Sequence, residues 1–141
     1  MKKATLDVYG KGKDVVPDGN IRGSTFKFLK EENWKPHPLV KESVINLVLS
    51  KAENDADITC MFGKVPKGTD IPEHFHELSN DIMVPLEGKA KIWVNGAGEF
   101  EMRKGVIINI PKGVKHRVFD VEEDLLVFVI YTPGLKWDVS L

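Results

Sequence analysis

Two histidines and several carboxylates stand close together in one short stretch, "GTDIPEHFHELSND", residues 68–81. Imidazole nitrogens and carboxylate oxygens are ligands for divalent transition metals, so these residue types fit a metal site. In a β-strand, residues two apart point to the same face, which would place His74 and His76 together. The alternative interpretation is a solvated strand face that happens to carry two imidazoles. The spacing of the surrounding residues has to decide between them.

A turn after His76 would supply a third group. The stretch "ELSN" has the length of a four-residue hairpin loop, which would make His76 and Asp81 opposite partners on adjacent strands. Directly opposed Cβ atoms lie about 4.5–5.5 Å apart on one face of a sheet. A further histidine, His116, follows the turn residues Pro111 and Gly113. Spacing alone does not bring His116 to the first cluster.

These residues belong to a long series of short β-rich runs that begins near Ser43. The runs "SVINLVLS" and "ITCMFGKV" are separated by the loop "KAENDAD", and "NGAG" later marks a hairpin. In total the pattern predicts about eight or nine short strands at intervals of roughly ten residues, with no convincing helix. Such spacing is typical of an antiparallel sandwich or a small barrel.

The first 40 residues are the least regular part of the chain. Glycine and proline interrupt them, and no helical period persists. We expect an extended arm with one short strand near Ser24–Leu29, or a short helix at Lys27–Glu32. Residues 1–40 are therefore assigned to an N-terminal arm of the same domain, and residues 41–141 to the β-barrel.

Composition places bounds on the function. The chain has 141 residues, 42% hydrophobic and 29% charged, which suits one soluble globular domain. The net charge is −1, and acidic and basic residues are interspersed, so the sequence shows no basic patch that would bind nucleic acid or an anionic membrane. The longest apolar run, Leu125 to Ile130, is too short for a membrane span. No apolar signal segment follows the N-terminal lysines, and Cys60 is the single cysteine, so we expect a cytoplasmic protein.

The spacing of the glycines, histidines and acids resembles the two sequence motifs of the cupin family. The first motif is matched, with aspartate where the family usually has glutamate, by Gly68, His74, His76, Asp81 and Gly88. The second is matched, with aspartate where the family has asparagine, by Gly105, Pro111, Gly113, His116 and Asp120. Sixteen residues separate the motifs, as in small microbial members. The resemblance spans residues 68–120.

This resemblance implies an all-β, double-sheet jelly-roll barrel that holds one divalent metal ion inside. Carried over, the ligands would be His74, His76, Asp81 and His116. The donor set suits Fe, Mn, Zn, Ni or Cu, and the sequence does not choose among them. Open coordination positions would admit a substrate oxygen, water or O₂. Because aspartate is one methylene shorter than glutamate, Asp81 could bind directly, act through a water, or leave a three-histidine site.

Strand alternation suggests which other residues line the pocket. Met83 shares the face of Asp81 and should approach the metal. Further candidates for the pocket wall, whose phase is not fixed, are Met61, Trp93, Phe128 and Tyr131. A catalytic base, if the reaction needs one, could be Asp120 or a metal-bound hydroxide. We expect His37, between two prolines in the arm, to be exposed or to pack rather than to bind metal.

Charged and apolar residues around the motifs suggest partners. The basic residues Lys112, Lys115 and Arg117 could attract an anionic substrate, or could be plain solvated charges. If the histidines face inward, Phe75 and Phe119 face outward and need covering. The arm could cover them, from the same chain or from a partner. Cupins commonly dimerise through such surfaces, so we expect a homodimer, with a folded-back monomer as the alternative.

The resemblance implies a metal-dependent enzyme acting on a small polar metabolite by dioxygenase, isomerase or lyase chemistry. The alternative is a non-catalytic module that binds a small ligand or sugar, and a purely structural barrel is a third class. Small cupins that ketonise unsaturated uronates share the "YTP" near the C-terminus. They carry an acid and an arginine where this chain has Val129 and Leu135, so that activity is not supported.

Overall fold

The structure is a computed structural model that describes residues 19–21, 24–26 and 31–135. The chain divides into two compact units, Met1–Asn33 and Trp34–Leu141. In the first unit, strand β1 (Gly19–Ile21) pairs antiparallel with β2 (Ser24–Phe26), and a 3-10 helix, η1, spans Glu31–Asn33. The strand expected near Ser24 is therefore present, and residues 27–30 lie outside the described part. No helix in the described residues is long and apolar enough to cross a membrane.

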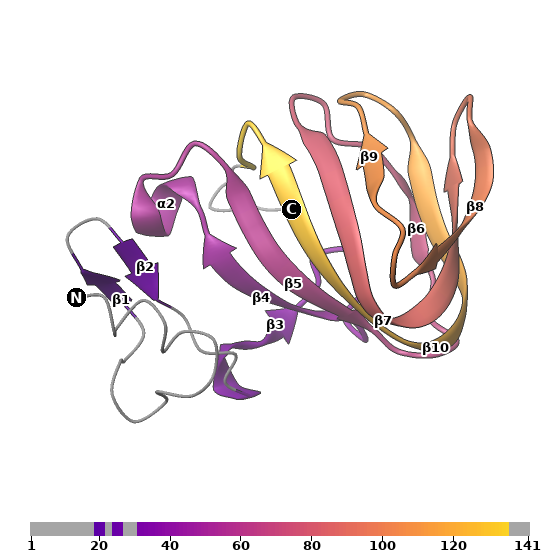
Figure 1. Ribbon diagram of the computed structural model, residues 1–141, viewed down its shortest axis with the longest axis horizontal. Helices are drawn as coiled ribbons and strands as arrows, with labels where there is room; N and C mark the ends of the chain where they lie inside the picture. Colours follow the sequence, from indigo (N-terminus) through magenta and orange to yellow (C-terminus); the bar gives the residue numbers. More distant parts are fainter. Residues whose placement is uncertain (1–18, 22–23, 27–30, 136–141) are drawn as a thin grey trace. The chain divides into compact units, whose positions relative to one another are not determined.

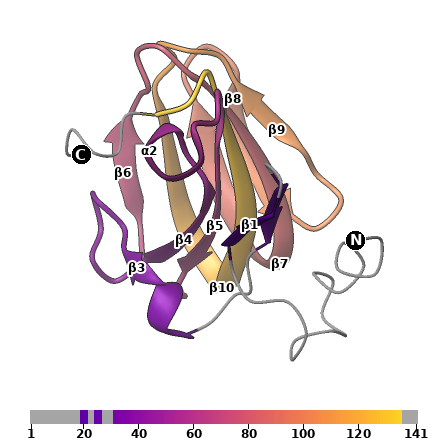
Figure 2. The same cartoon turned by 90° about the vertical axis from the view of Figure 1, so that its left-hand side faces the viewer.

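The second unit contains one antiparallel sheet of eight strands (Figure 1). The strands are β3 (Lys35–Pro36), β4 (Val44–Leu49), β5 (Thr59–Val65), β6 (Ile71–His74), β7 (Asn80–Val94), β8 (Gly98–Arg103), β9 (Ile108–Ile110) and β10 (His116–Thr132). Their order is β3-β4-β5-β10-β7-β8, with β6 paired to β10 and β9 paired to β7. The predicted all-β class is confirmed. Figure 2 shows β4, β5 and β10 side by side in this sheet.

One short helix lies where the sequence predicts only a loop. Helix α2 spans Lys51–Asn54, between β4 and β5. Ser50 stands at its N-cap, and its side chain accepts a hydrogen bond from the backbone N–H of Glu53 at 3.1 Å. Serine at an N-cap satisfies one of the free donors of a helix start. This local capping stabilises a single helical turn that is too short to show a hydrophobic period.

Strands β7 and β10 are each one long bent strand, whereas the sequence predicts only short strands. Gly88 in β7 and Asp120 in β10 have left-handed backbone angles, with φ of 88° and 47°. A Cβ at Gly88 would lie 2.1 Å from the backbone carbonyl oxygen of Asp124, so the close approach of the two paired strands requires glycine. The register between the strands shifts after Phe119.

The bend in β10 is what positions the candidate site. The first part of β10 pairs with β6, at His116 and Val118. The last part, Leu125 to Tyr131, pairs with β5. The buried side chains of this last part alternate with half-buried ones, so one face of β10 contributes continuously to the core. Residues from distant parts of the chain thereby meet around the inside of the barrel.

Candidate metal centre

Three histidines meet where β6 and β10 pair. His74, the last residue of β6, is the direct cross-strand partner of His116, the first residue of β10. His76 follows β6 by two residues. One ligand atom from each of the three imidazoles lies within 4.8 Å of the other two. The ring centroids of His74 and His116 are 4.3 Å apart.

Asp81 reaches the same place by a route that the sequence does not predict. The expected hairpin between β6 and β7 is wrong, because β6 pairs with β10 and not with β7. Asp81 pairs instead with Tyr131 on β10 and with Ile110 on β9. The start of β10 lies between β6 and the end of β7, since His116 pairs with both His74 and Val94. Hydrogen bonds between sequence-distant strands thus replace the local hairpin.

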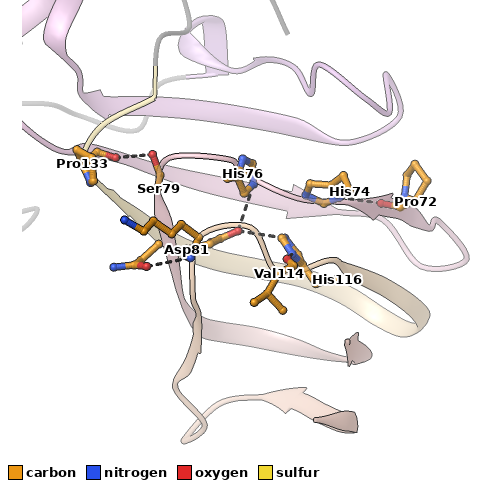
Figure 3. Close-up of polar contacts among 10 residues, drawn as sticks. Pro72, His74, His76, Ser79, Asp81, Val114, His116 and Pro133 are labelled. Carbon is orange, nitrogen blue, oxygen red and sulfur yellow. Dashed lines mark hydrogen bonds and ion pairs between the residues drawn. The ribbon is translucent and has the colours of Figure 1, made fainter. Parts of the chain in front are cut away.

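The side chain of Asp81 nevertheless faces two of the imidazoles (Figure 3). Its Oδ2 lies 3.4 Å from Nε2 of His76 and 3.3 Å from Nε2 of His116. Both distances exceed the roughly 2.7–2.9 Å of a charged hydrogen bond. The carboxylate is 1% exposed, and neither of its oxygens has a hydrogen-bond partner. Nε2 of His76 and Nε2 of His116 are also buried without one.

Backbone carbonyls determine the tautomers of two of the histidines. Nδ1 of His74 lies 2.7 Å from the carbonyl oxygen of Pro72, and Nδ1 of His116 lies 3.0 Å from that of Val114. A carbonyl can only accept a hydrogen bond, so each Nδ1 carries the proton. In the neutral imidazole, each Nε2 then holds a lone pair, which is the form that binds a metal. Figure 3 shows both contacts.

These atoms fit a divalent metal ion. Four buried polar atoms, two carboxylate oxygens and two imidazole nitrogens, have no hydrogen-bond partner. Buried polar groups in proteins are normally satisfied, and a group of unsatisfied ones calls for a missing ion or water. Neutral imidazoles and one carboxylate form a mixed nitrogen and oxygen set that suits first-row transition metals. The fit rests on this geometry and on the donor types.

The protonation states of the site follow from burial and from mutual contacts. Burial lowers the pKa of His74 to about 4, although the Pro72 carbonyl partly opposes this, so the imidazole is neutral at neutral pH. Burial by itself raises the pKa of Asp81, but the contacts with His116 and His76 outweigh it and hold this pKa below its ordinary value. Asp81 is therefore a carboxylate. All of these states suit metal binding.

Two cavities adjoin the histidines. The inner cavity, with a volume of about 60 Å³, has a mostly apolar lining that includes Met61, Met83 and Val129. The mouth cavity, of about 140 Å³, is lined by Pro38, Leu39 and Phe75 beside the histidines. A buried water needs about 10–15 Å³ by this measure, so the inner cavity holds only a few small groups. His37, His74 and Tyr131 line both cavities.

The structure brings some of the expected wall residues to the site and not others. Met61, Met83 and Tyr131 line the inner cavity. Phe128 does not, because it alternates with the buried Val127 and Val129 and packs against Phe62 with ring centroids 5.0 Å apart. Trp93 lines neither cavity, because it lies between Ile92 and Val94, which are both buried. The phase of each strand separates the two groups.

The charged residues around the second motif also lie outside the two cavities. Asp120 is exposed, and its carboxylate lies 3.8 Å from Nζ of Lys91. Arg117 donates a hydrogen bond to Asp70 at 2.6 Å. Neither Asp120 nor Arg117 lines the inner or the mouth cavity. Of the two phenylalanines expected to face outward, Phe75 is 50% exposed, whereas Phe119 is half-buried.

The sequence interpretation did not assign two residues to the pocket that the structure places there. His37 and Ser43 both line the inner cavity. The backbone N–H of His37 donates to the carbonyl of Ser43 at 2.8 Å, next to the pairing of β3 with β4. The prolines on both sides of His37 suggested an irregular arm. Pro36 pairs with Val44 instead, and no local sequence pattern predicts this contact.

Comparisons with known proteins agree with this fold. The family model described as "Cupin domain" matches residues 61–131. Quercetin 2,3-dioxygenase from Bacillus subtilis (strain 168) is 23% identical over 101 residues, which is 72% of this chain and 28% of that protein. The chain therefore spans little more than a quarter of the curated relative that it matches.

Solved structures are similar in fold at low identity. KdgF from Halomonas sp. superposes with a TM-score of 0.65 at 18% identity, covering 80% of this chain and 99% of that one. A predicted oxalate decarboxylase from Thermotoga maritima gives 0.63 at 18% identity, with 76% and 99% covered. Ectoine synthase from P. lautus gives 0.64 at 12% identity, with 76% and 73% covered. The family match extends over half of the sequence and includes all four candidate ligands, so the chain belongs to the cupin family.

Proposed function

We propose that this protein binds one divalent transition metal ion through His74, His76, His116 and Asp81, and that it is a metal-dependent enzyme acting on a small polar metabolite. The observation that carries the proposal is the group of unsatisfied buried Nε2 and carboxylate atoms between β6, β7 and β10. Direct binding by Asp81 is supported by its Oδ2, which faces two imidazole nitrogens at once.

A bound divalent ion would supply Lewis-acid polarisation of a substrate oxygen or, for iron or copper, redox chemistry. The chain supplies the rest. The Pro72 and Val114 carbonyls hold two imidazoles in the tautomer with a free Nε2. The apolar wall of the inner cavity limits the entry of water. Burial raises the pKa of Tyr131 well above its ordinary value, and the negative charge of Asp81 adds a smaller effect in the same direction. The Tyr131 hydroxyl therefore stays protonated.

A binding module without catalysis is the second candidate. Among the described residues that line the two cavities, Asp81 is the sole carboxylate. If Asp81 binds the metal, no lining carboxylate remains to act as a general base. That observation favours a protein that holds a small ligand at its metal. Oxygen consumption and product analysis with small keto acids, diols and sugars would separate turnover from binding.

The homodimer and the cytoplasmic location remain predictions. Light scattering of the purified protein tests the homodimer.

Metal stoichiometry tests the proposal itself. Protein purified without a histidine tag should contain about one divalent ion per chain by elemental analysis. His74→Ala and His116→Ala should each lose most of this metal, because each removes one nitrogen ligand. Asp120→Asn is the matched control: it removes an exposed carboxylate outside the cavities and should keep the metal. Full metal content in both histidine variants would show that the site is elsewhere.

A further inference from the structure

Two polar side chains that line the inner cavity have no part in the proposed metal centre. His37 lies just after β3, and Ser43 lies just before β4. Both line the inner cavity together with His74 and Asp81. The hydrogen bond from the His37 N–H to the Ser43 carbonyl holds their backbones together. Any ligand that fills the inner cavity would therefore meet both side chains.

His37 has the opposite tautomer to His74 and His116. Its Nδ1 accepts a hydrogen bond from the backbone N–H of Leu39 at 3.0 Å. A neutral imidazole whose Nδ1 accepts must carry its proton on Nε2. Burial lowers the pKa of His37, and the nearby His76 lowers it further, so the neutral form persists at neutral pH. His37 therefore offers an N–H donor at Nε2 rather than a metal-binding lone pair.

Ser43 is the second polar group. It is 1% exposed, and its Oγ is buried without a hydrogen-bond partner. A buried hydroxyl without a partner is unfavourable, because burial removes its hydrogen bonds to water and nothing replaces them. A ligand oxygen in the inner cavity would satisfy it. Because a hydroxyl both donates and accepts, Ser43 could pair with a carbonyl, a carboxylate or a hydroxyl group.

The remaining lining indicates what kind of ligand would carry that oxygen. Most of the lining of the inner cavity is apolar, and the cavity is small. The part of the ligand that enters it must therefore be compact. The mouth cavity is apolar at Leu39 and Phe75, which are 49% and 50% exposed. Among the described residues that line either cavity, Lys64 is the one Lys or Arg, and its Nζ lies 4.2 Å from the centre of the Trp34 ring. Such a lining does not suit a phosphate or a polyol.

We propose that the His37 Nε2–H and the Ser43 hydroxyl form a subsite for the carbonyl or carboxylate oxygen of a small ligand with an apolar substituent. The compact oxygen-bearing head would lie at the metal centre, and the apolar part would contact Leu39 and Phe75 in the mouth cavity. This inference rests on the proposed metal site and adds a substrate class to it. His37 and Ser43 are positioning groups for the ligand, not metal ligands.

The test uses protein loaded with Co²⁺, whose visible absorption responds to a ligand at the metal. Phenylpyruvate is the probe, because it joins a keto-acid head to an apolar ring, and inorganic phosphate is the comparison anion. Phenylpyruvate should bind the wild-type protein more tightly than phosphate. His37→Leu and Ser43→Ala should each weaken the binding of phenylpyruvate by about tenfold, as expected for one lost hydrogen bond to a charged acceptor. Co²⁺ affinity should change by less than about twofold, since neither residue is a ligand.

Two further variants separate a binding role from a structural one. His37→Gln keeps an N–H donor at a similar reach and should restore much of the affinity that His37→Leu loses. Arg117→Gln removes a cation outside both cavities and should leave phenylpyruvate affinity unchanged. Ser43→Ala should unfold at the same temperature as the wild type or higher without ligand, because its hydroxyl has no partner.

The outcomes distinguish this inference from the proposed function. Failure of the wild type to bind Co²⁺ stoichiometrically overturns both. Normal Co²⁺ binding with phenylpyruvate affinity unchanged in His37→Leu and in Ser43→Ala overturns the subsite alone. Phosphate binding as tight as phenylpyruvate, or no binding of phenylpyruvate to the Co²⁺ form, overturns the ligand class. Loss of phenylpyruvate affinity in both variants, with recovery in His37→Gln, supports the subsite.

Discussion

His74 and His116 are direct cross-strand partners, 42 positions apart in the chain, with ring centroids 4.3 Å apart. Both rings donate Nδ1–H to a carbonyl two residues earlier in the chain. The same local arrangement on two paired strands thus orients both Nε2 atoms. Metal affinity in this protein should depend on this pairing as much as on the identity of the ligands.

Metal binding should raise the thermal stability of the wild-type protein but not that of a variant that lacks one metal-binding side chain. An ion that binds only the folded state stabilises it by about 2.7 kcal/mol at a free concentration of 100 times its Kd. Differential scanning calorimetry of the metal-free protein, with and without added Zn²⁺ or Mn²⁺, measures the shift. The unfolding temperature of His116→Ala should respond little. An equal shift in the variant would mean that stabilising ions bind somewhere else.

The contribution of Asp81 to metal affinity can be tested by changing the charge and the length of its side chain separately. Asp81→Asn should weaken metal affinity by about tenfold or more, or about 1.4 kcal/mol, because it removes the one negative ligand. Asp81→Glu keeps the charge, and we expect it to recover most of the affinity. Competition with a chromogenic chelator gives the affinities. Unchanged affinity in Asp81→Asn would leave a three-histidine centre with Asp81 outside the coordination sphere.

The metal-free protein should lose stability in mild acid through His74. Its pKa is about 4 in the folded state, against an ordinary value of 6.5 for histidine. Between these values the unfolded chain binds a proton that the folded protein does not, so the free energy of unfolding falls as the pH is lowered through this window. The lowered pKa of Asp81 has the same sign, and its contribution is lost as the pH falls below the ordinary carboxyl range.

Urea denaturation of metal-free protein across this pH window measures the slope. His74→Gln, which removes the titrating group and keeps a polar side chain, should flatten it. The same slope in wild type and variant would contradict the shifted pKa of His74. Bound metal should flatten the wild-type slope as well, because a ligated imidazole cannot take up the proton.

Gly88 should be the least replaceable glycine of the barrel. An alanine Cβ there would lie 2.1 Å from the Asp124 carbonyl oxygen, at a φ of 88°. We expect Gly88→Ala to be destabilised by more than the roughly 1–2 kcal/mol of a left-handed alanine alone, because backbone must also move. Gly96 has a φ of 84° with nothing within 4 Å, so Gly96→Ala isolates the conformational cost. Chemical denaturation compares the two, and equal losses would rule out the clash.

Much of the fold could be predicted from local patterns. The β-rich runs and the turn residues between them correspond to observed strands, because strand propensity and turn chemistry act over a few residues. The same patterns could not show that Gly88 and Asp120 carry β7 and β10 around bends as single strands. Helix α2 also escaped notice, because one turn capped by Ser50 has no period to detect.

The sequence by itself determined which residue types stand at motif spacing, and the resemblance of that spacing to the cupin motifs implied His74, His76, Asp81 and His116 as one candidate set. The tertiary structure decided how they meet: β10 lies between β6 and β7, so Asp81 faces His76 and His116 without being the hairpin partner of His76. It also decided that His37 and Ser43 line the inner cavity. Side-chain alternation is encoded over two residues of one strand, whereas pairing depends on hydrogen bonds between segments that are distant in the chain.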